Sequence, residues 1–527
     1  MANRSNVMGL HGLKNKTSRN SFDLSHRNLF TAKVGELLPC FVQEVNPGDS
    51  LKLDSSYFTR TAPLETAAFT RLRENVQYFF VPYQCLWKYF EGQVRNITKN
   101  AAGGDISMIA KSPFQNAKQS TDMPYISYSD LHNYLNTLMY VNSDDISESS
   151  NPLRYNNGTY RHCETAKLLQ LLGYGNFQQQ YKPLSNTRYT LQGCQNPPAL
   201  SVFRLLAYQK ICNDFYTYQQ WQPYNASLAN IDYVTPDSNN MNLGVLFTGS
   251  SIENNLSKMN FLDMRFSNLP LDYFNGVLPV AQYGSESVVN LKNAGTSNVI
   301  SDSGGWQTQN GSSVDAHSPI KSGNTSAASF GFSMSIGNTK IEHNHSIPAG
   351  SINVPLSVMA LRQATALQKY KEIQLANDPD FESQVEAHFG IKPSHDMHKS
   401  RFIGGSSSMI DINPVVNQNL GFDSYNSNQA ITKAAPTGSG GSSFKFKADT
   451  YGLVIGIYRC TPVLDYEHVG IDRTLLKTDA SDFVIPELDS IGMQQTFCCE
   501  VYSPSSISGT STNTFDLSQT YGYAPGY

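Results

Sequence analysis

Charged residues are scarce in this chain of 527 residues: Asp, Glu, Lys and Arg make up 16%, against about 25% in an average soluble domain. Glycine and polar uncharged residues fill the difference, together with 29 Tyr and 27 Phe. Such residues favour turns and pleated strands, so we expect a β-rich protein with long loops. Glu, Lys and Ala are too few for a long coiled coil, and 39% apolar residues are too many for a chain that is disordered throughout.

Long apolar runs are also missing. No stretch approaches the roughly 18 apolar residues that a membrane-spanning helix needs, so we expect no membrane insertion. The N-terminal MANRSNVMGLHGLKNKTSRN is basic but has no apolar core of a secretory signal. The net charge is −4. This value excludes coating of nucleic acid by bulk charge and restricts any such contact to local features.

The eight cysteines form no C-x-x-C pair and no regular framework. We expect reduced thiols, as in a protein made in a cytoplasm. Cys498 and Cys499 are adjacent in an apolar, strand-like run, and ordinary disulfide geometry disfavours a bridge between neighbours. We therefore predict that both are buried and reduced.

The common catalytic motifs are absent: there is no P-loop, no G-x-G-x-x-G, no H-E-x-x-H and no G-x-S-x-G. His395 and His398 form an H-x-x-H, and Glu342, His343 and His345 cluster in a polar segment. A helix or turn could converge either group on a metal, but solvated loop histidines are the interpretation that we favour. None of the 43 acidic residues has a context typical of a glycosidase pair. We expect neither an enzyme nor a cofactor.

Strand-like segments stand at both ends of the chain. Residues 35–45 and 50–54 read as strands around the turn NPGD, and 75–83 is an apolar run suited to a strand covered on both faces. Residues 450–460 and 482–502 are strand-like again. This distribution predicts one β-domain, closed by its first and last strands, in which most residues belong to connections.

Helical spacing appears between these ends. One helix is expected over 131–138, another that stops at Gly173, and a third that opens at 196–198. A fourth, over 355–378, carries an apolar stripe. We interpret such stripes as packing faces. The stripe consists of Leu356, Met359, Ala360, Ala364, Leu367 and Tyr370.

Basic residues gather in an extended arm, 1–33, which has six cations and one acid. Counterion release favours cations near an extended backbone on nucleic acid. The alternatives are a solvated tail for the arm and, for the two arginines near residue 72, ion pairs with Glu65 or Glu74. The candidate DNA contacts are Arg4, Lys14, Lys16, Arg19, Arg71 and Arg73.

Two stretches of low charge interrupt the chain. Residues 284–346 are rich in Gly, Ser and Asn, which predicts a surface insertion, and 417–443 is expected to be a flexible loop. Scattered apolar residues could serve as packing anchors for the insertion. The anchors that we single out are Trp306, Phe330 and Phe332.

Residues 30–88 form one distinctive block, and five shorter ones follow it in order: FRLLAYQKICNDFY, DYFNGVLPVAQYG, LRQATALQKY, AHFGIKP and RFIGGSSSMIDINPVV. Together these blocks resemble the major capsid protein of microviruses, small icosahedral phages with circular single-stranded DNA. Residues 30–88 look like the N-terminal block of that family, and the other blocks follow in the family's order. The run KLLQLLGYGNF and the MANRSN start are similar to a gokushovirus-like branch from gut Bacteroidales. The segment 521–527 has Gly526 where the family has Arg, which puts C-terminal DNA contacts in doubt.

The resemblance implies a mainly β fold: an eight-stranded antiparallel jelly-roll barrel with long inserted loops and short helices, in one domain, 34–527. It also implies a homo-oligomeric icosahedral shell of about sixty copies around single-stranded DNA. The expected partners are minor virion proteins, scaffolding proteins and a host cell-surface receptor. The expected location is the virion, after synthesis in the bacterial cytoplasm.

Two other classes remain open, because jelly rolls also carry lectins and enzymes. A glycan-binding surface protein would need an export signal or a lipoprotein cysteine near the N-terminus, and neither is present. A glycosidase on a β-rich scaffold would lose polysaccharide cleavage when one Asp or Glu is replaced.

Overall fold

The structure is a computed structural model, and it divides into two compact units, 1–279 with 392–527 and 280–391, each described by itself. The described residues are 20–62, 71–87, 90, 124–128, 131, 135, 163–177, 198–222, 261–287, 307–308, 341–342, 358–377, 381–391, 399–415, 433–466, 470–479, 482–483, 485–486, 492–502 and 516–525.

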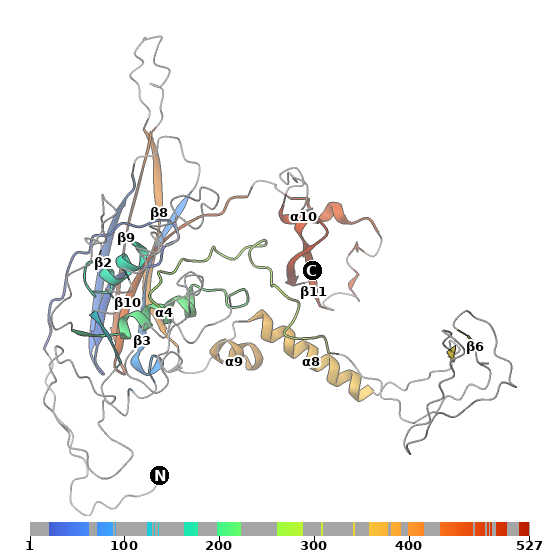
Figure 1. Ribbon diagram of the computed structural model, residues 1–527. Coiled ribbons are helices and arrows are strands. Elements are labelled where there is room, and N and C mark those ends of the chain that lie inside the picture. The colour runs from blue at the N-terminus through green and yellow to red at the C-terminus, as the bar shows by residue number, and fades with distance from the viewer. Residues whose placement is uncertain are drawn as a thin grey trace, which may run out of the picture. The chain divides into compact units, whose positions relative to one another are not determined.

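A six-stranded antiparallel sheet dominates the first unit (Figure 1). Its order is β1-β10-β3-β8-β9-β2. The predicted strands near 35–45, 50–54, 75–83 and 450–460 are confirmed, with shifts of a few residues at their ends. The strands are β1 (Leu38–Val45), β2 (Ser50–Arg60), β3 (Leu72–Pro82), β8 (Arg401–Val415), β9 (Lys433–Lys447) and β10 (Gly452–Pro462).

The sheet must curl, because its two edge strands are consecutive in sequence. Five strand spacings of about 4.8 Å would separate β1 from β2 by about 24 Å in a flat sheet. The link 46–49 spans five Cα steps, or at most about 18 Å. In the structure, the amide N–H of Gly48 donates to the carbonyl of Ala448, and that of Ala448 to the carbonyl of Asp49. The fold observed is therefore a curled half-barrel of six strands; an eight-stranded barrel is not seen in the part of the chain that the structure describes.

The concave face of this sheet is filled by aromatic rings. Tyr78 of β3 lies 6.1 Å from the ring of Phe41 and 5.1 Å from that of Phe444. Phe80 packs 4.9 Å from Phe446, in a cluster to which Val454 also belongs. Rings from β1, β3 and β9 meet here because the curl brings their strands around one core.

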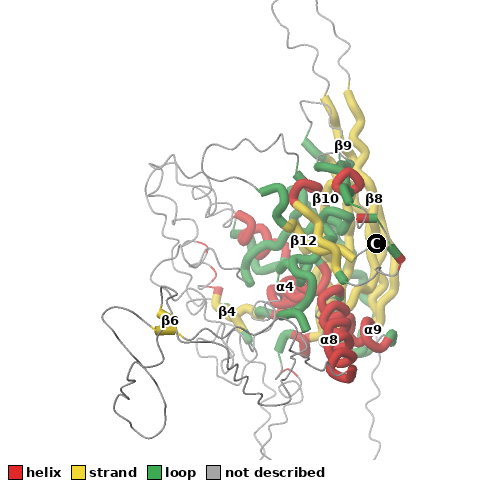
Figure 2. The backbone as a smooth tube through the Cα atoms, turned by 90° about the vertical axis from the view of Figure 1, so that its right-hand side faces the viewer, coloured by secondary structure: helices red, strands yellow, loops and turns green. Residues whose placement is uncertain are grey.

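Strands β8 and β9, both long in Figure 2, are rich in Gly and Ser and differ from the expectation. Residues 433–443 of the stretch interpreted as flexible lie in β9, and 416–432 lie outside the described residues. Glycine is unfavourable in an isolated strand, but a Cβ on Gly404 would stand 2.7 Å from the Phe444 ring. The ring occupies the space that the glycine leaves, so tertiary packing overrides the local preference.

The convex face carries helix α4 (Phe203–Phe215) over β3 and β10. Phe79 of β3 lies 4.6 Å from Phe215 and 5.9 Å from Tyr216, ring centre to ring centre. Helix α4 begins later than predicted, because the residues after Pro198 first form strand β5 (Ala199–Ser201). The first unit is thus a curled sheet with a helical layer on part of its outer side.

The helix over 163–171 ends as predicted, at Gly173, whose φ is +86°. A left-handed backbone conformation of this kind favours glycine. Arg204 of α4 donates from Nη1 to the carbonyl of Leu172 at 2.9 Å, so a neighbouring cation satisfies the helix C-terminus. The expected helix near 131–138 is supported by Leu131 and Leu135, which are helical and fully buried.

Smaller elements complete the first unit. The run 482–502 was expected to be a strand, but its described part holds a short strand and then a helical turn that begins at Cys498. Leu278 pairs with Tyr523 in an isolated bridge, which ties 261–279 to the C-terminal hairpin. These elements are β4 (Tyr125–Ser127), η1 (Tyr83–Cys85), η4 (Arg473–Leu476), β11 (Met493–Phe497), α10 (Cys498–Val501) and β12 (Thr520–Pro525).

The second unit holds β6 (Gln307–Thr308), β7 (Ile341–Glu342), α8 (Val358–Ala376) and α9 (Phe381–Phe389). The expected helix is confirmed as α8. Its predicted apolar stripe is a packing face only in part: Met359 is 70% exposed and Leu367 is 48% exposed, whereas the Tyr370 ring stacks on His388 of α9 with 4.9 Å between ring centres. The other side of α8 also packs, because Lys371 Nζ donates to the carbonyl of Ser285 at 2.7 Å.

Candidate functional site

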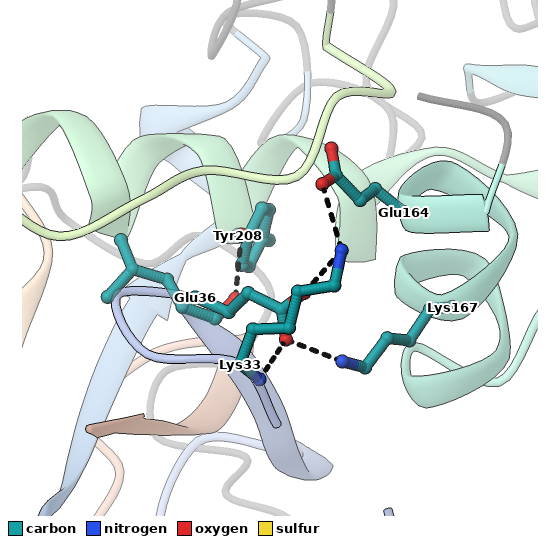
Figure 3. Close-up of polar contacts among 6 residues, drawn as sticks. Lys33, Glu36, Glu164, Lys167 and Tyr208 are labelled. Atoms are coloured by element: carbon teal, nitrogen blue, oxygen red, sulfur yellow. Dashed lines mark hydrogen bonds and ion pairs between the residues drawn. The ribbon is translucent and has the colours of Figure 1, made fainter. Parts of the chain in front are cut away.

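A buried ion-pair cluster joins the end of the arm, the start of β1 and the helix over 163–171 (Figure 3). Glu36 is 1% exposed, and its Oε2 lies 2.5 Å from Lys167 Nζ. The same oxygen accepts from the backbone N–H of Lys33 at 2.8 Å. Lys33 Nζ lies 3.6 Å from Glu164 Oε1 and 4.0 Å from Glu36 Oε1. Two lysines and two carboxylates thus alternate in one chain of contacts.

Tyr208 of α4 extends this cluster into the core. Its buried hydroxyl donates to the carbonyl of Leu37 at 2.8 Å and accepts from the N–H of Arg265 at 2.9 Å. Gln209 donates to the carbonyl of Phe261 at 2.8 Å and accepts from Arg265 Nε at 2.6 Å. Helix α4 therefore holds two segments that are distant in sequence, one at Leu37 and one at 261–265.

Burial governs the protonation of this region. Desolvation raises the pKa of Glu164, although the nearby Lys33 opposes the change. Desolvation also raises the pKa of Tyr208 well above its usual value and that of Cys212 to about 12. Groups whose charged forms are disfavoured in this way are weak nucleophiles at neutral pH. The cluster fastens the arm to the fold and presents no activated group.

A second buried carboxylate, Glu74, lies on the concave face. It accepts from Thr59 Oγ1 at 2.6 Å, from Ser408 Oγ at 3.0 Å and from the Tyr458 hydroxyl at 3.2 Å. A Cβ on Gly438 would stand 2.4 Å from Glu74 Oε1, so the strand backbone closes over the carboxylate. Hydroxyls from three other strands satisfy a charge that has no room beside it for a substrate.

The two described arginines among the candidate DNA contacts lie on the surface near the start of β3. Arg71 Nη2 lies 2.6 Å from Asp465 Oδ1, and both side chains are more than half exposed. Arg73 is exposed and makes no ion pair with a described residue. The ion pairing considered with Glu74 is wrong, because that carboxylate is bonded to hydroxyls on the concave side. Glu65 lies outside the described residues.

The remaining sequence candidates lie outside the described side chains, namely Arg4, Lys14, Lys16, Arg19, Trp306, Phe330, Phe332, His343, His345, His395 and His398. Within the described ranges, no three His, Cys, Asp or Glu side chains gather as metal ligands. The described helices are also too short or too polar to cross a bilayer. Cys498 and Cys499 are buried free thiols, as predicted.

One basic surface escaped the sequence analysis. Lys52 on β2 faces Lys445 across the ladder with β9, and Lys447 is the next exposed residue along β9. In sequence Lys52 stands almost 400 residues before the other two lysines, so the three belong to no single basic run. The alternation F-K-F-K in 444–447 was the available indication of a strand with one basic face.

The two buried carboxylates described above fasten segments of the chain together, Glu36 through cations and Glu74 through hydroxyls. This arrangement fits a structural protein. Comparison with known proteins agrees. The family model described as "Capsid protein (F protein)" matches residues 13–122 and 195–527, which is most of the chain.

Two curated relatives carry the same description. Capsid protein VP1 of Chlamydia phage 1 is 23% identical over 511 residues, which cover 92% of this chain and 78% of that protein. Capsid protein VP1 of Bdellovibrio phage phiMH2K is 31% identical over 75 residues, 14% of each chain. The chain belongs to the phage capsid protein (F protein) family, which confirms the resemblance to microvirus major capsid proteins. It is a structural subunit of a multi-subunit capsid and thus part of a virion.

Proposed function

We propose that about sixty copies of this chain close into an icosahedral shell around a circular single-stranded DNA genome. The supporting observation is the curled sheet, in which the link 46–49 joins the two edge strands. A sheet closed in this way is a rigid wall element whose long connections are left to contact neighbouring copies. We further propose that the six strands belong to an eight-stranded jelly roll formed by one domain, 34–527.

The arm, 1–33, is proposed to reach the genome with its first part. The described part packs on the fold: the ring of His26 stacks on Phe41, and Phe30 lies 5.5 Å from Tyr458. Lys33 is engaged by Glu36 in the buried cluster. Contacts to DNA therefore fall to the basic residues before residue 20, supplemented at the surface by Arg71 and Arg73.

Electron microscopy of the purified protein tests the shell. Closed particles with icosahedral symmetry and about sixty copies, carrying nuclease-protected single-stranded DNA, are expected. Open sheets, small oligomers or closed particles without DNA would each contradict part of the proposal. Scaffolding or minor virion proteins would appear as additional bands that purify with assembly intermediates.

The insertion 284–346 is proposed to project from the shell and to contact a host receptor, with Trp306, Phe330 and Phe332 packing against symmetry-related copies. Its low charge and its content of Gly, Ser and Asn support a surface position. Replacing 285–345 by a short Gly/Ser bridge should leave closed shells that no longer adsorb to cells, since shortening a surface loop changes closure entropy little. Failure to assemble would mean that the insertion builds the wall, and full infectivity would remove its role in attachment.

Synthesis in the bacterial cytoplasm is part of the proposal. It is supported by the free thiols of the described cysteines, several of them buried. Reduced, buried thiols are typical of a protein that folds in a reducing compartment.

A further inference from the structure

No described element covers the outer side of strands β2 and β9, whereas α4 contacts β3 and β10. Side chains on the two strands alternate between half-buried and exposed, and the exposed set forms what we call the β2–β9 face. Its small members are Ser50, Ser56, Ser439, Gly441 and Ser443, and its large or charged members are Lys52, Asp54, Phe58, Arg60, Lys445 and Lys447.

The β2–β9 face is strongly basic in an acidic chain. It carries four cations and one carboxylate, while the whole chain has a net charge of −4. Lys52 Nζ lies 2.8 Å from Asp54 Oδ2. Lys445 and Lys447 make no ion pair with a described residue, although the Lys445 charge also attracts Asp54 and helps to lower the pKa of its carboxyl. The next acid on this side, Asp411 of β8, lies two strands away from Arg60.

The register makes this arrangement costly for the isolated chain. Lys52 stands directly opposite Lys445, and like charges directly opposite in an antiparallel ladder are destabilising. Lysines on an edge strand can serve to prevent edge-to-edge aggregation, which would account for Lys52. It does not account for Lys445 and Lys447, because β9 is an interior strand. A polyanion lying on the face would relieve the repulsion.

The other end of the β2–β9 face carries an aromatic platform. Phe58 is 61% exposed, and the guanidinium carbon of Arg60 lies 5.1 Å from the centre of its ring. An exposed ring beside a cation is suited to stack on an unpaired base. From Lys52 to Arg60 the strand extends about 27 Å at roughly 3.4 Å per residue, and the small Ser and Gly side chains between leave the surface open to a polymer.

We propose that the β2–β9 face binds single-stranded polynucleotide, with Lys52, Lys445 and Lys447 on phosphates and Phe58 stacked on a base. The inference rests on the proposed function in one respect, since the natural ligand would be the enclosed genome. Cations along a strand supply affinity without sequence preference, and the exposed ring selects single strands over duplex, whose bases are paired and stacked.

Binding of a labelled oligothymidylate to the unassembled full-length chain, over a series of salt concentrations, is the test. The K445Q/K447Q variant should lower the slope of log affinity against log salt by about 1.4, at about 0.7 per phosphate contact, and weaken binding about tenfold. The K445R/K447R variant should bind as the unmodified chain does. Phe58→Ala should weaken binding about fivefold or more while leaving the salt slope unchanged.

The matched control is R362Q/K369Q on α8, which removes two exposed cations from another unit and should change neither slope nor affinity. Equal losses in the control and in K445Q/K447Q would show a bulk charge effect and overturn the proposal. The proposal would also be overturned if K445Q/K447Q bound oligothymidylate as the unmodified chain does but failed to assemble. That result would mean that the β2–β9 face contacts a second copy of the chain. Particles that lack DNA, combined with face-dependent binding of the oligonucleotide, would refute the proposed genome enclosure and leave this inference standing.

Discussion

Replacing Lys167 by Met should destabilise the fold by about 3 kcal/mol, because it removes the closest cation from Glu36. That carboxylate is 1% exposed, and the Lys167 side chain is 14% exposed. Breaking a buried ion pair by deleting one partner costs about 3–5 kcal/mol, since the remaining charge stays buried without compensation. The Lys33 backbone N–H at 2.8 Å and its Nζ at 4.0 Å remain in place, so we place the loss at the lower end of that range.

A double-mutant cycle separates the pair from simple loss of packing. The Glu36→Gln/Lys167→Met variant no longer buries an unpaired charge and should lose only about 1 kcal/mol. The double variant would then be about 2 kcal/mol more stable than Lys167→Met, and the Glu36→Gln single variant completes the cycle that gives the coupling energy. Lys369→Met, on the exposed side of α8, is the matched control and should have no effect.

Urea unfolding of the unassembled chain measures the loss as a change in midpoint at constant slope. Hydrogen exchange adds the local readout, because 163–171 should open before the rest of the fold in the Lys167→Met variant. A loss below about 1 kcal/mol, with unchanged exchange in 163–171, would refute the reasoning that Glu36 depends on this cation.

Three further outcomes are expected. Gly404→Ala should lower the free energy of unfolding by about 1–3 kcal/mol through overpacking, because the added Cβ would meet the Phe444 ring at 2.7 Å. Full stability in urea unfolding would show that the ring moves freely. Cys498 and Cys499 are buried and should react with iodoacetamide only after unfolding, whereas the exposed Cys163 should react first. A mass difference between particles alkylated with and without prior reduction would contradict the prediction of free thiols. Glutamine at all four arm positions should lower the salt slope of DNA retention by about 0.7 per lost contact, and an unchanged slope would assign the arm another task. Those positions are Arg4, Lys14, Lys16 and Arg19.

The sequence by itself determined the local structure wherever a residue had few alternatives. Gly173 could end a helix because glycine adopts the positive φ that the structure has there. The apolar run of β3 predicted a strand covered on both faces, and this strand lies in the interior of the sheet. Family membership was visible as well, because many ordered blocks are more specific than any short motif.

Only the tertiary structure decided which segments meet. The Gly- and Ser-rich strands β8 and β9 are poor strands in isolation, and they become stable where the rings of Tyr57 and Phe444 fill the space over Gly440 and Gly404. No periodicity in the sequence indicates that Glu36 and Lys167 form a pair. The two residues are 131 positions apart, so their contact depends on how the distant segments pack together. The basic β2–β9 face arises in the same way, because the register of two distant strands places Lys52 opposite Lys445. The preference of a residue for helix or strand acts over a few neighbours in sequence, whereas burial and charge act through space. The curl of the sheet sets the distances between segments that are far apart in sequence.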